Sequence, residues 1–216
     1  MLTLVMDFYY IPSSAPCRAV QMTAKALGVE LNKKFLNLRK EEHLTPEFLK
    51  INPQHTVPTL VDGDFILWES RVIMIYLCDK FDTEKKWYPA CPKQRALVHH
   101  RMFFDLTTLN KSFADYYYPT MLTGAPADPN MLVNIEQAFT LFNTLLEGNK
   151  FAAGDFVTIA DISLLSTVTT FDSVKYDFRK YANVARWYEE CKTAVPGYAE
   201  NLEGCKIFEK IFRNKL

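Results

Sequence analysis

Strand and helix patterns alternate in the first part of this chain and only helical patterns follow, and this constrains its fold more than any other feature. A β-branched and aromatic run at residues 2–10 is typical of a strand. Apolar residues then recur at helical spacing up to Gly28, which predicts a helix that ends there. A second, shorter strand is expected at residues 35–38. These three elements predict a βαβ unit.

A short helix, a hairpin and another helix are expected to complete this part. The short helix begins near Pro46, because proline is well tolerated in a first helical turn. Asp62 and Gly63 lie between two apolar runs, and Asp-Gly is a strong signal of a tight hairpin turn. A helix over residues 72–79 follows, with Ser70 as its expected N-cap. The predicted order is therefore βαβαββα.

The second part of the chain is predicted to be helical throughout. Helices are expected at residues 94–118, 129–147, 159–171, 184–194 and 198–212. Thr158 and Asp161 stand three residues apart at the start of one of them, in the pattern of a capping box. This pattern is worth about 0.5–2 kcal/mol to a helix, so we assign both residues to folding rather than to a ligand.

The patterns and the charge balance together indicate the class of protein. They predict an α/β domain at residues 1–82, a linker at residues 83–92 and an all-α helical bundle at residues 93–216. Acidic and basic residues number 25 each, so neither nucleic acid nor a membrane surface is an expected partner. The longest apolar run, at residues 72–78, is too short to span a bilayer.

The five cysteines indicate a reducing compartment. Their number is odd and none forms a Cys-x-x-Cys pair, which is the usage of cytosolic proteins. The first ten residues lack a basic leader and include Asp7, so a signal peptide is not expected. The sequence contains no metal-binding or phosphate-binding motif, and no metal site is predicted. These features favour a cytoplasmic protein.

Polar residues gather at the predicted strand–helix junctions, where folds of this kind bind ligands. Ser14 directly precedes the first helix, whose N-terminal N–H groups favour an anion. Pro58 directly precedes a strand and is a candidate cis peptide that would turn the backbone of Val57 toward an extended ligand. Residues 69–71, Glu-Ser-Arg, place an acid, a hydroxyl and a cation at another helix start.

Each of these groups also has a simpler interpretation. Ser14 caps its helix, Pro58 is an ordinary trans proline, and the charges of residues 69–71 are solvated. His43 and His55, half of the histidines in the chain, are then surface imidazoles. Taken together, however, the groups offer anion sites, a cation site and an exposed backbone edge. That combination suits a small zwitterionic peptide.

Several runs of residues resemble the cytosolic glutathione transferases of insects, delta class. The runs are residues 9–18, 50–60, 68–71, 112–119, 158–161 and 181–188. The resemblance implies a thioredoxin-like N-terminal domain, an all-helical C-terminal domain and a homodimer. It also implies that glutathione is a co-substrate, with no permanently bound cofactor, and that the activity is conjugation of hydrophobic electrophiles in detoxification. Dehydrochlorinase and peroxidase side activities belong to the same expectation.

The resemblance also assigns roles to individual residues. Ser14 becomes the catalytic hydroxyl, which stabilises the thiolate of bound glutathione. The implied glutathione contacts are His43, His55, Val57, Pro58, Glu69, Ser70 and Arg71. Asp105 is expected to support Arg71 in a buried ion-pair network. This chain carries Ser13 where the class usually has glycine, and this serine adds a second hydroxyl beside the first.

A single hydroxyl is sufficient in magnitude for the implied chemistry. Lowering a thiol pKa by about two units requires roughly 2.7 kcal/mol of preferential thiolate stabilisation. A hydrogen bond to a charged group contributes about 1.5–3 kcal/mol, and a helix N-terminus adds about 0.3–1 kcal/mol. No general base or metal is required.

An apolar pocket for the electrophile is expected beside the sulfur. Its candidates are Ile11, Ala15, Pro16, Tyr118, Leu122, Phe208 and Phe212. For each aromatic residue the alternative is packing in the core or in an interface. Met102, Phe103 and Phe104 are predicted to form a dimer seam.

Two other functions stay open from the sequence. The first is a non-catalytic protein of the same fold that binds ligands or partners. The second is a thiol transferase that uses Cys17, which lies one turn into the first helix.

Overall fold

The computed structural model describes residues 5–214 and contains a four-stranded mixed sheet of order β2-β1-β3-β4. Its strands are β1 (Met6–Tyr10), β2 (Leu31–Phe35), β3 (Thr59–Asp62) and β4 (Phe65–Trp68). Strand β1 pairs in parallel with β2 and antiparallel with β3, which forms a hairpin with β4. The accompanying helices are α1 (Ala15–Ala26), α2 (Pro46–Ile51) and α3 (Ser70–Phe81). The predicted order βαβαββα is confirmed, and residues 2–4 of the predicted first strand lie outside the described residues.

The second strand lies earlier in the chain than predicted. Strand β2 ends at Phe35, and the predicted residues 35–38 instead lead into two 3-10 turns, η1 (Leu38–Lys40) and η2 (Glu42–Leu44). The side chain of Asn37 accepts hydrogen bonds from the N–H groups of the first turn, which favours that turn over a strand. Strand β2 is an edge strand with mostly exposed side chains, so it lacks the apolar run on which the prediction relied.

The rest of the described chain contributes helices and a minimal β-bridge between Phe151 and Gly154. The helices are α4 (Pro92–Phe104), α5 (Asn110–Thr123), α6 (Pro129–Leu145), α7 (Ile159–Ser173), α8 (Ala182–Ala194) and α9 (Tyr198–Arg213). The single helix predicted at residues 94–118 is divided into α4 and α5 by η3 (Asp105–Leu109), a π-helical turn. Within residues 5–214 we find no helix with the length and apolar character needed to cross a membrane.

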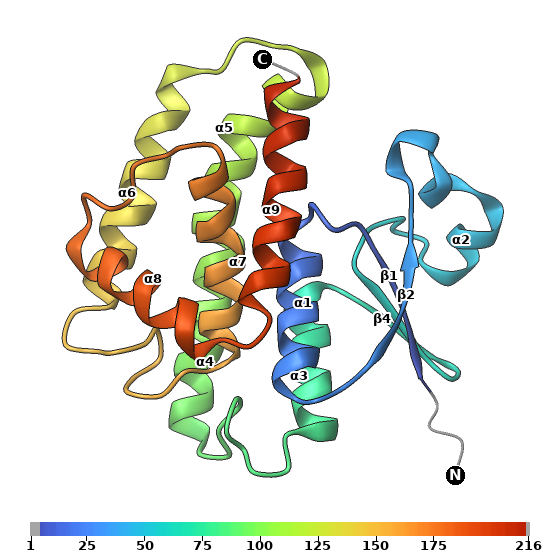
Figure 1. Cartoon of the computed structure of the whole chain (residues 1–216), viewed down its shortest axis with the longest axis horizontal. Coiled ribbons are helices and arrows are strands. Elements are labelled where there is room, and N and C mark those ends of the chain that lie inside the picture. The colour runs from blue at the N-terminus through green and yellow to red at the C-terminus, as the bar shows by residue number, and fades with distance from the viewer. Residues whose placement is uncertain (1–4, 215–216) are drawn as a thin grey trace.

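Helix α7 is the centre of the core. Figure 1 shows α1 and α3 between the sheet and the other helices, with α2 on the far side of the sheet. Helix α7 contacts α1, α3, α4, α8 and α9, and all its residues except Asp172 are buried. Its hydroxyl groups donate to carbonyls one turn earlier, for example Thr169 to Leu165 at 2.8 Å, which satisfies polar groups in a buried helix. Thr158 and Asp161 form a capping box at its start.

Gly204 lies where α9 crosses α1, and we predict that Gly204→Ala destabilises the protein. A Cβ atom at this position would overlap the carbonyl oxygen of Pro12 and the Cδ atom of Arg18. Alanine favours a helix interior by about 1 kcal/mol over glycine, but overpacking against backbone costs about 1–3 kcal/mol and occasionally more. Urea unfolding is expected to show a net loss, whereas Glu203→Ala on the exposed face changes little. Equal or greater stability of Gly204→Ala would contradict the packing argument.

Candidate active site

Ser14 occupies the N-cap of α1 with its hydroxyl free to donate a hydrogen bond. Its backbone is extended, with φ −75° and ψ 121°, and its Oγ accepts a hydrogen bond from the N–H of Cys17 at 3.3 Å. Within residues 5–214 no oxygen or nitrogen accepts the Ser14 hydroxyl proton, and the side chain of Ser13 makes no hydrogen bond. An anion placed at this helix N-terminus would meet both the Ser14 O–H and the positive end of the helix dipole.

A buried asparagine holds the loop that carries His55. Asn52 is fully buried, and its Nδ2 donates to the carbonyl of Thr56 at 3.2 Å and to Oγ1 of Thr59 at 2.9 Å. The N–H of His55 donates to the carbonyl of Asn52 at 2.9 Å. The imidazole of His55 is left exposed at the surface. The loop is thus fixed by hydrogen bonds to its backbone, and the imidazole remains available for a ligand.

Two further features surround this loop. The peptide bond between Val57 and Pro58 is cis, as predicted. The rings of His43 and His55 lie 6.0 Å apart between centroids. The Nδ1 atom of His43 is buried and has no hydrogen-bond partner among the described residues. The two imidazoles, on separate segments, therefore face a common region.

The start of α3 differs from the prediction. Ser70 is the first helical residue, and Glu69 holds the N-cap position without a capping bond from its side chain. Because Ser70 lies inside the helix, its side chain does not cap it; it is 3% exposed and accepts a hydrogen bond from Arg71 Nη1 at 3.3 Å. The Glu69 side chain is exposed. The exposed carboxylate of Glu69 therefore lies next in sequence to the buried hydroxyl of Ser70.

Arg71 is held by groups from distant parts of the chain. Its Nη2 lies 2.5 Å from Oδ2 of Asp105, which is fully buried in η3. Ser163 of α7 donates to the same Asp105 oxygen at 2.5 Å. A guanidinium held in this way has a fixed direction. Ser163 is absent from the prediction, because nothing in a serine-rich and threonine-rich helix marks which hydroxyl faces a carboxylate.

Two of the predicted ligand residues have left-handed backbone. His55 has φ 49° and Glu69 has φ 72°. Such conformations cost residues other than glycine on the order of 1–3 kcal/mol and cluster at ligand sites. The unusual backbone at both positions therefore supports a binding role for this surface.

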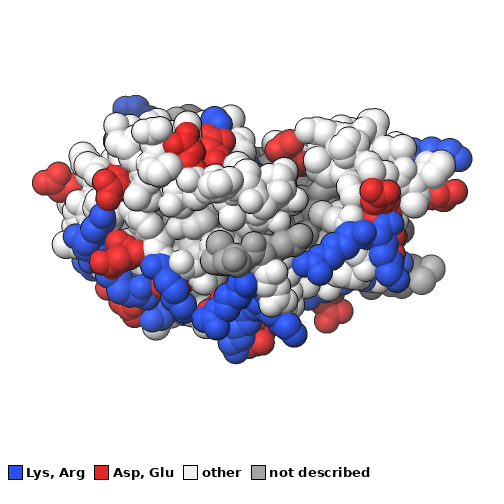
Figure 2. All heavy atoms as spheres, turned by 90° about the horizontal axis from the view of Figure 1, so that it is seen from above, with Lys and Arg blue, Asp and Glu red and all other residues white. Residues whose placement is uncertain are grey.

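The predicted electrophile contacts divide into two groups. Ala15 is buried, and Ile11 and Pro16 are half-buried around the start of α1, while Tyr118 and Leu122 are 38% and 76% exposed at the end of α5. Figure 2, seen from above the orientation of Figure 1, shows a notch between the two lobes that is bordered mainly by uncharged side chains. Such walls suit an apolar ligand.

The two C-terminal aromatic candidates lie in the core and not beside the predicted electrophile. Phe208 and Phe212 are 6% and 9% exposed. The ring of Phe208 lies 5.8 Å from that of Phe113, and the ring of Phe212 lies 5.6 Å from that of Tyr117. Both rings thus pack in the core, where they support the wall formed by α5.

Cys17 is poorly placed to act as a nucleophile. It is fully buried, and burial raises the pKa of its thiol to about 11. A thiol with such a pKa is almost entirely protonated at neutral pH and unreactive. Within the described residues no three His, Cys, Asp or Glu side chains gather closely enough to hold a metal ion.

We predict that Cys91 is the one thiol of the native protein that reacts rapidly with an aromatic disulfide reagent. It is exposed at the N-terminus of α4, where the N–H groups of Gln94 and Lys93 lower its pKa. The other four cysteines are buried, and burial raises the pKa of Cys78 to about 12. Cys91→Ala is expected to remove the fast phase, and unfolding should expose the remaining thiols. A fast phase that survives in Cys91→Ala would contradict this assignment.

Comparison with known proteins identifies the family. Residues 4–79 match the profile of the glutathione S-transferase N-terminal domain, and residues 81–193 match that of the glutathione S-transferase C-terminal domain. The chain belongs to the glutathione S-transferase family. Its N-terminal domain is therefore thioredoxin-like and its C-terminal domain is helical, as predicted.

Solved structures of insect glutathione transferases are similar over almost the whole chain. A delta-class glutathione transferase of Nilaparvata lugens is 45% identical with a TM-score of 0.95, over 98% of this chain and 100% of that one. A glutathione transferase of Bombyx mori is 40% identical with a TM-score of 0.94, over 98% and 99%. A homologue from Drosophila mojavensis, solved with bound glutathione, is 32% identical with a TM-score of 0.90, over 98% and 97%. The resemblance to the insect delta class is confirmed, and this glutathione transferase is an enzyme.

Proposed function

We propose that this enzyme uses Ser14 to stabilise the thiolate of bound glutathione for attack on hydrophobic electrophiles. The free Ser14 hydroxyl at the N-cap of α1 is the observation that carries this assignment. The oxygen accepts one hydrogen bond, from the N–H of Cys17, and the proton remains available to donate to the sulfur. One such bond and the helix N-terminus together supply about 2–4 kcal/mol. That range covers a thiol pKa reduction of about two units, which corresponds to roughly 2.7 kcal/mol.

The surrounding groups match a zwitterionic tripeptide. The exposed Glu69 carboxylate suits the ammonium of the glutamyl residue, and the Ser70 hydroxyl suits its carboxylate. Arg71, fixed by Asp105, adds positive charge at the same end. The backbone of Val57 before the cis Pro58 suits the extended cysteinyl portion. His43 and His55 suit the carboxylate of the glycyl residue.

The electrophile is assigned to the space beside the start of α1. Its proposed contacts are Ile11, Ala15 and Pro16 at that helix start and the exposed Tyr118 and Leu122 of α5, with the buried Phe208 and Phe212 as support. An activated thiolate in an apolar pocket supports conjugation, and the same group supports dehydrochlorination and hydroperoxide reduction as side activities. All five cysteines are free, which suits work in a reducing compartment such as the cytosol.

Binding and turnover on glutathione test this function directly. The wild-type protein is expected to be retained on immobilised glutathione, to be eluted by free glutathione and to conjugate chlorodinitrobenzene. Absorbance of the conjugate follows the reaction. Retention without conjugation would establish a ligand carrier instead, and absence of retention would contradict the assigned site.

The chain is further proposed to act as a homodimer, which Phe103→Glu is expected to dissociate. Phe103 is 63% exposed, while its neighbours Met102 and Phe104 are buried. Beside it lies an apolar groove of about 250 Å³, so one surface carries both a projecting ring and a groove, as a two-fold interface needs. Light scattering after size exclusion measures the mass. Phe156→Glu, which changes a ring that is 76% exposed in the loop before α7, is the control and should leave the dimer intact. A dimeric Phe103→Glu variant would place the interface elsewhere.

A further inference from the structure

Arg18 links the helix that begins at Ser14 to two helices of the C-terminal domain. It lies one turn into α1, where its backbone N–H donates to the carbonyl of Ser14 at 3.0 Å. Its side chain is 1% exposed. Within the described residues its hydrogen-bond acceptors all lie on α7 and α9, and none of the residues assigned to glutathione is among them. Any effect of this side chain on the reaction therefore passes through the start of α1.

One side of the guanidinium group is bound to α7. Nη1 donates to Oγ1 of Thr169 at 3.1 Å. Nη2 donates to Oγ1 of Thr170 at 2.5 Å and to the carbonyl of Ser166 at 3.3 Å. Because a guanidinium is a planar fork, bonds to both of its terminal nitrogens fix its direction as well as its position.

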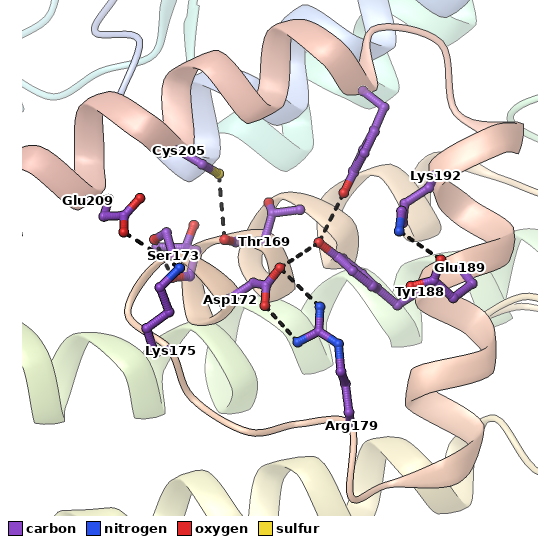
Figure 3. Close-up of polar contacts among 12 residues, drawn as sticks. Thr169, Asp172, Ser173, Lys175, Arg179, Tyr188, Glu189, Lys192, Cys205 and Glu209 are labelled. Atoms are coloured by element: carbon purple, nitrogen blue, oxygen red, sulfur yellow. Dashed lines mark hydrogen bonds and ion pairs between the residues drawn. The ribbon is translucent and has the colours of Figure 1, made fainter.

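The same group is bound to α9. Nη1 is also within hydrogen-bonding distance of Oδ1 of Asn201, which is 2% exposed, and of Sγ of Cys205 at 2.9 Å. Figure 3 shows Cys205 directed at α7, where its Sγ donates to the carbonyl of Thr169 at 3.6 Å. The helices α7 and α9 are thus joined to each other at the point where both hold Arg18.

A glycine allows α9 to approach the loop before Ser14. Gly204 packs against the carbonyl oxygen of Pro12 and the Cδ atom of Arg18, so closely that a Cβ atom would overlap both. Within residues 5–214 the carbonyl of Pro12 accepts no hydrogen bond, so packing against α9 is what holds it. Helix α9 therefore supports the Ser14 loop directly at Pro12, and the first turn of α1 through Arg18.

We propose that Arg18 is a positioning residue, which holds the Ser14 hydroxyl where it meets the sulfur of glutathione. This inference rests on the proposed function of Ser14. Since Ser14 is the N-cap residue, a shift of the first turn of α1 moves its Oγ atom directly. A misplacement of about 1 Å can cost a reaction on the order of 100-fold in rate. Helices α7 and α9 thus contribute to stabilising the thiolate without contacting glutathione.

Arg18→Met tests the proposal through the pKa of the enzyme-bound glutathione thiol. Methionine retains much of the aliphatic stem and removes the fork. The variant is expected to raise the thiol pKa by about one unit, which lowers kcat/KM about tenfold at a pH below both pKa values and leaves it unchanged above them. The ultraviolet absorbance of the bound thiolate gives the pKa independently of turnover. The KM for glutathione is expected to change little, because no group assigned to glutathione is removed.

The ionisable groups that interact with Arg18 leave this pH profile to glutathione. Burial raises the pKa of the Cys17 thiol to about 11 and also raises the pKa of the Cys205 thiol. It raises the pKa of the phenols of Tyr118 and Tyr188 in the same way. All four groups stay protonated around neutral pH, so a shift of the profile there reports the thiol of glutathione.

Asn201→Leu weakens the same bridge from α9, and Thr158→Ala is the control for stability. Asn201→Leu conserves volume, removes one acceptor of Arg18 and is expected to raise the thiol pKa by a smaller amount. It decides the question if Arg18→Met does not fold. Thr158→Ala weakens the start of α7, so it should lower stability in urea and leave the thiol pKa at the wild-type value. A wild-type pKa in the folded bridge variants, or an equal rise in Thr158→Ala, would overturn the positioning role.

A double variant distinguishes this inference from the proposed function. Ser14→Ala combined with Arg18→Met is expected to have the same thiol pKa as Ser14→Ala alone, because a displaced alanine has no hydroxyl to lose. A further rise in the double variant would mean that Arg18 acts by another route. If Ser14→Ala alone leaves the pKa unchanged, the proposed function of Ser14 is wrong. If Ser14→Ala raises the pKa and Arg18→Met does not, only the positioning role is wrong.

Discussion

Ser14→Ala is expected to lower the kcat/KM for conjugation at neutral pH by about 10- to 100-fold, since one charge-assisted hydrogen bond contributes about 1.5–3 kcal/mol. The Ser14 hydroxyl at the N-cap of α1 is the donor that the structure leaves free for an anion. Without it the pKa of bound glutathione rises toward the value of about 8.5 for a free thiol. The fraction of thiolate at neutral pH falls accordingly.

The pH dependence gives this prediction a definite sign. The thiolate is the reactive form, so activity is present above the thiol pKa and is lost below it. Because the variant has the higher thiol pKa, its deficit is largest at low pH and shrinks as the pH rises through that value. A pH profile of kcat/KM, together with the ultraviolet absorbance of the bound thiolate, measures both effects. A deficit of constant size at every pH would mean that Ser14 does not act on the thiol.

Three further variants separate catalysis from folding. Ser13→Ala removes the neighbouring hydroxyl and is expected to keep nearly full activity. Ser14→Asp retains a helix cap, worth about 0.5–2 kcal/mol, but places a negative charge near the thiolate, so it should fold well and conjugate poorly. Cys17→Ala removes a buried thiol and should remain active. Loss of activity in Ser13→Ala with retention in Ser14→Ala would exchange the roles of the two serines.

The fold was predictable from the sequence wherever a local signal was strong. Asp62-Gly63 between apolar runs predicts the hairpin of β3 and β4, and the hairpin is present. Its loop is one residue later than the predicted turn: Asp62 ends β3 and pairs with Phe65, and Gly63 supplies the positive φ, 65°, that the tight turn requires. Strand β2 was misplaced because its edge position allows exposed side chains and leaves no apolar pattern. The division of one predicted helix by the π-helical turn η3 also lacks a local signal, since hydrophobic spacing continues through it.

The residues of the candidate site could be predicted from the sequence, but most of the contacts among them could not. The resemblance implied Asp105 as a partner of Arg71, and the structure places them 2.5 Å apart. The hydrogen bond from Ser163 to Asp105 depends on how α7 packs against η3. The spacing of residues within either segment does not predict this packing. The acceptors of the buried Arg18 guanidinium are hidden for the same reason, because they lie on α7 and α9, far along the chain. Contacts between residues on distant elements could therefore not be predicted from the sequence.

Asp161→Ala is expected to lower the free energy of unfolding by about 3–5 kcal/mol, because it leaves several buried donors without an acceptor. Asp161 is fully buried, and its carboxylate accepts from the backbone N–H of Ala152 at 2.7 Å and from that of Thr158 at 2.8 Å. It also accepts from the indole N–H of Trp187 at 2.8 Å. One side chain thus joins the start of α7 to the preceding loop and to α8.

Two control variants show by how much the loss in free energy of unfolding exceeds the loss expected from removing a helix cap alone. Thr158→Ala removes the other half of the capping box and is expected to cost about 1 kcal/mol. Asp155→Ala removes an exposed carboxylate from the same loop and is expected to change stability by no more than about 0.5 kcal/mol. Urea unfolding of all three variants gives the order. A domain of this size is stable by about 5–15 kcal/mol, so the Asp161→Ala loss would remove a large share of it. If Asp161→Ala costs no more than Thr158→Ala, the carboxylate only caps α7 and its bonds to Ala152 and Trp187 contribute little.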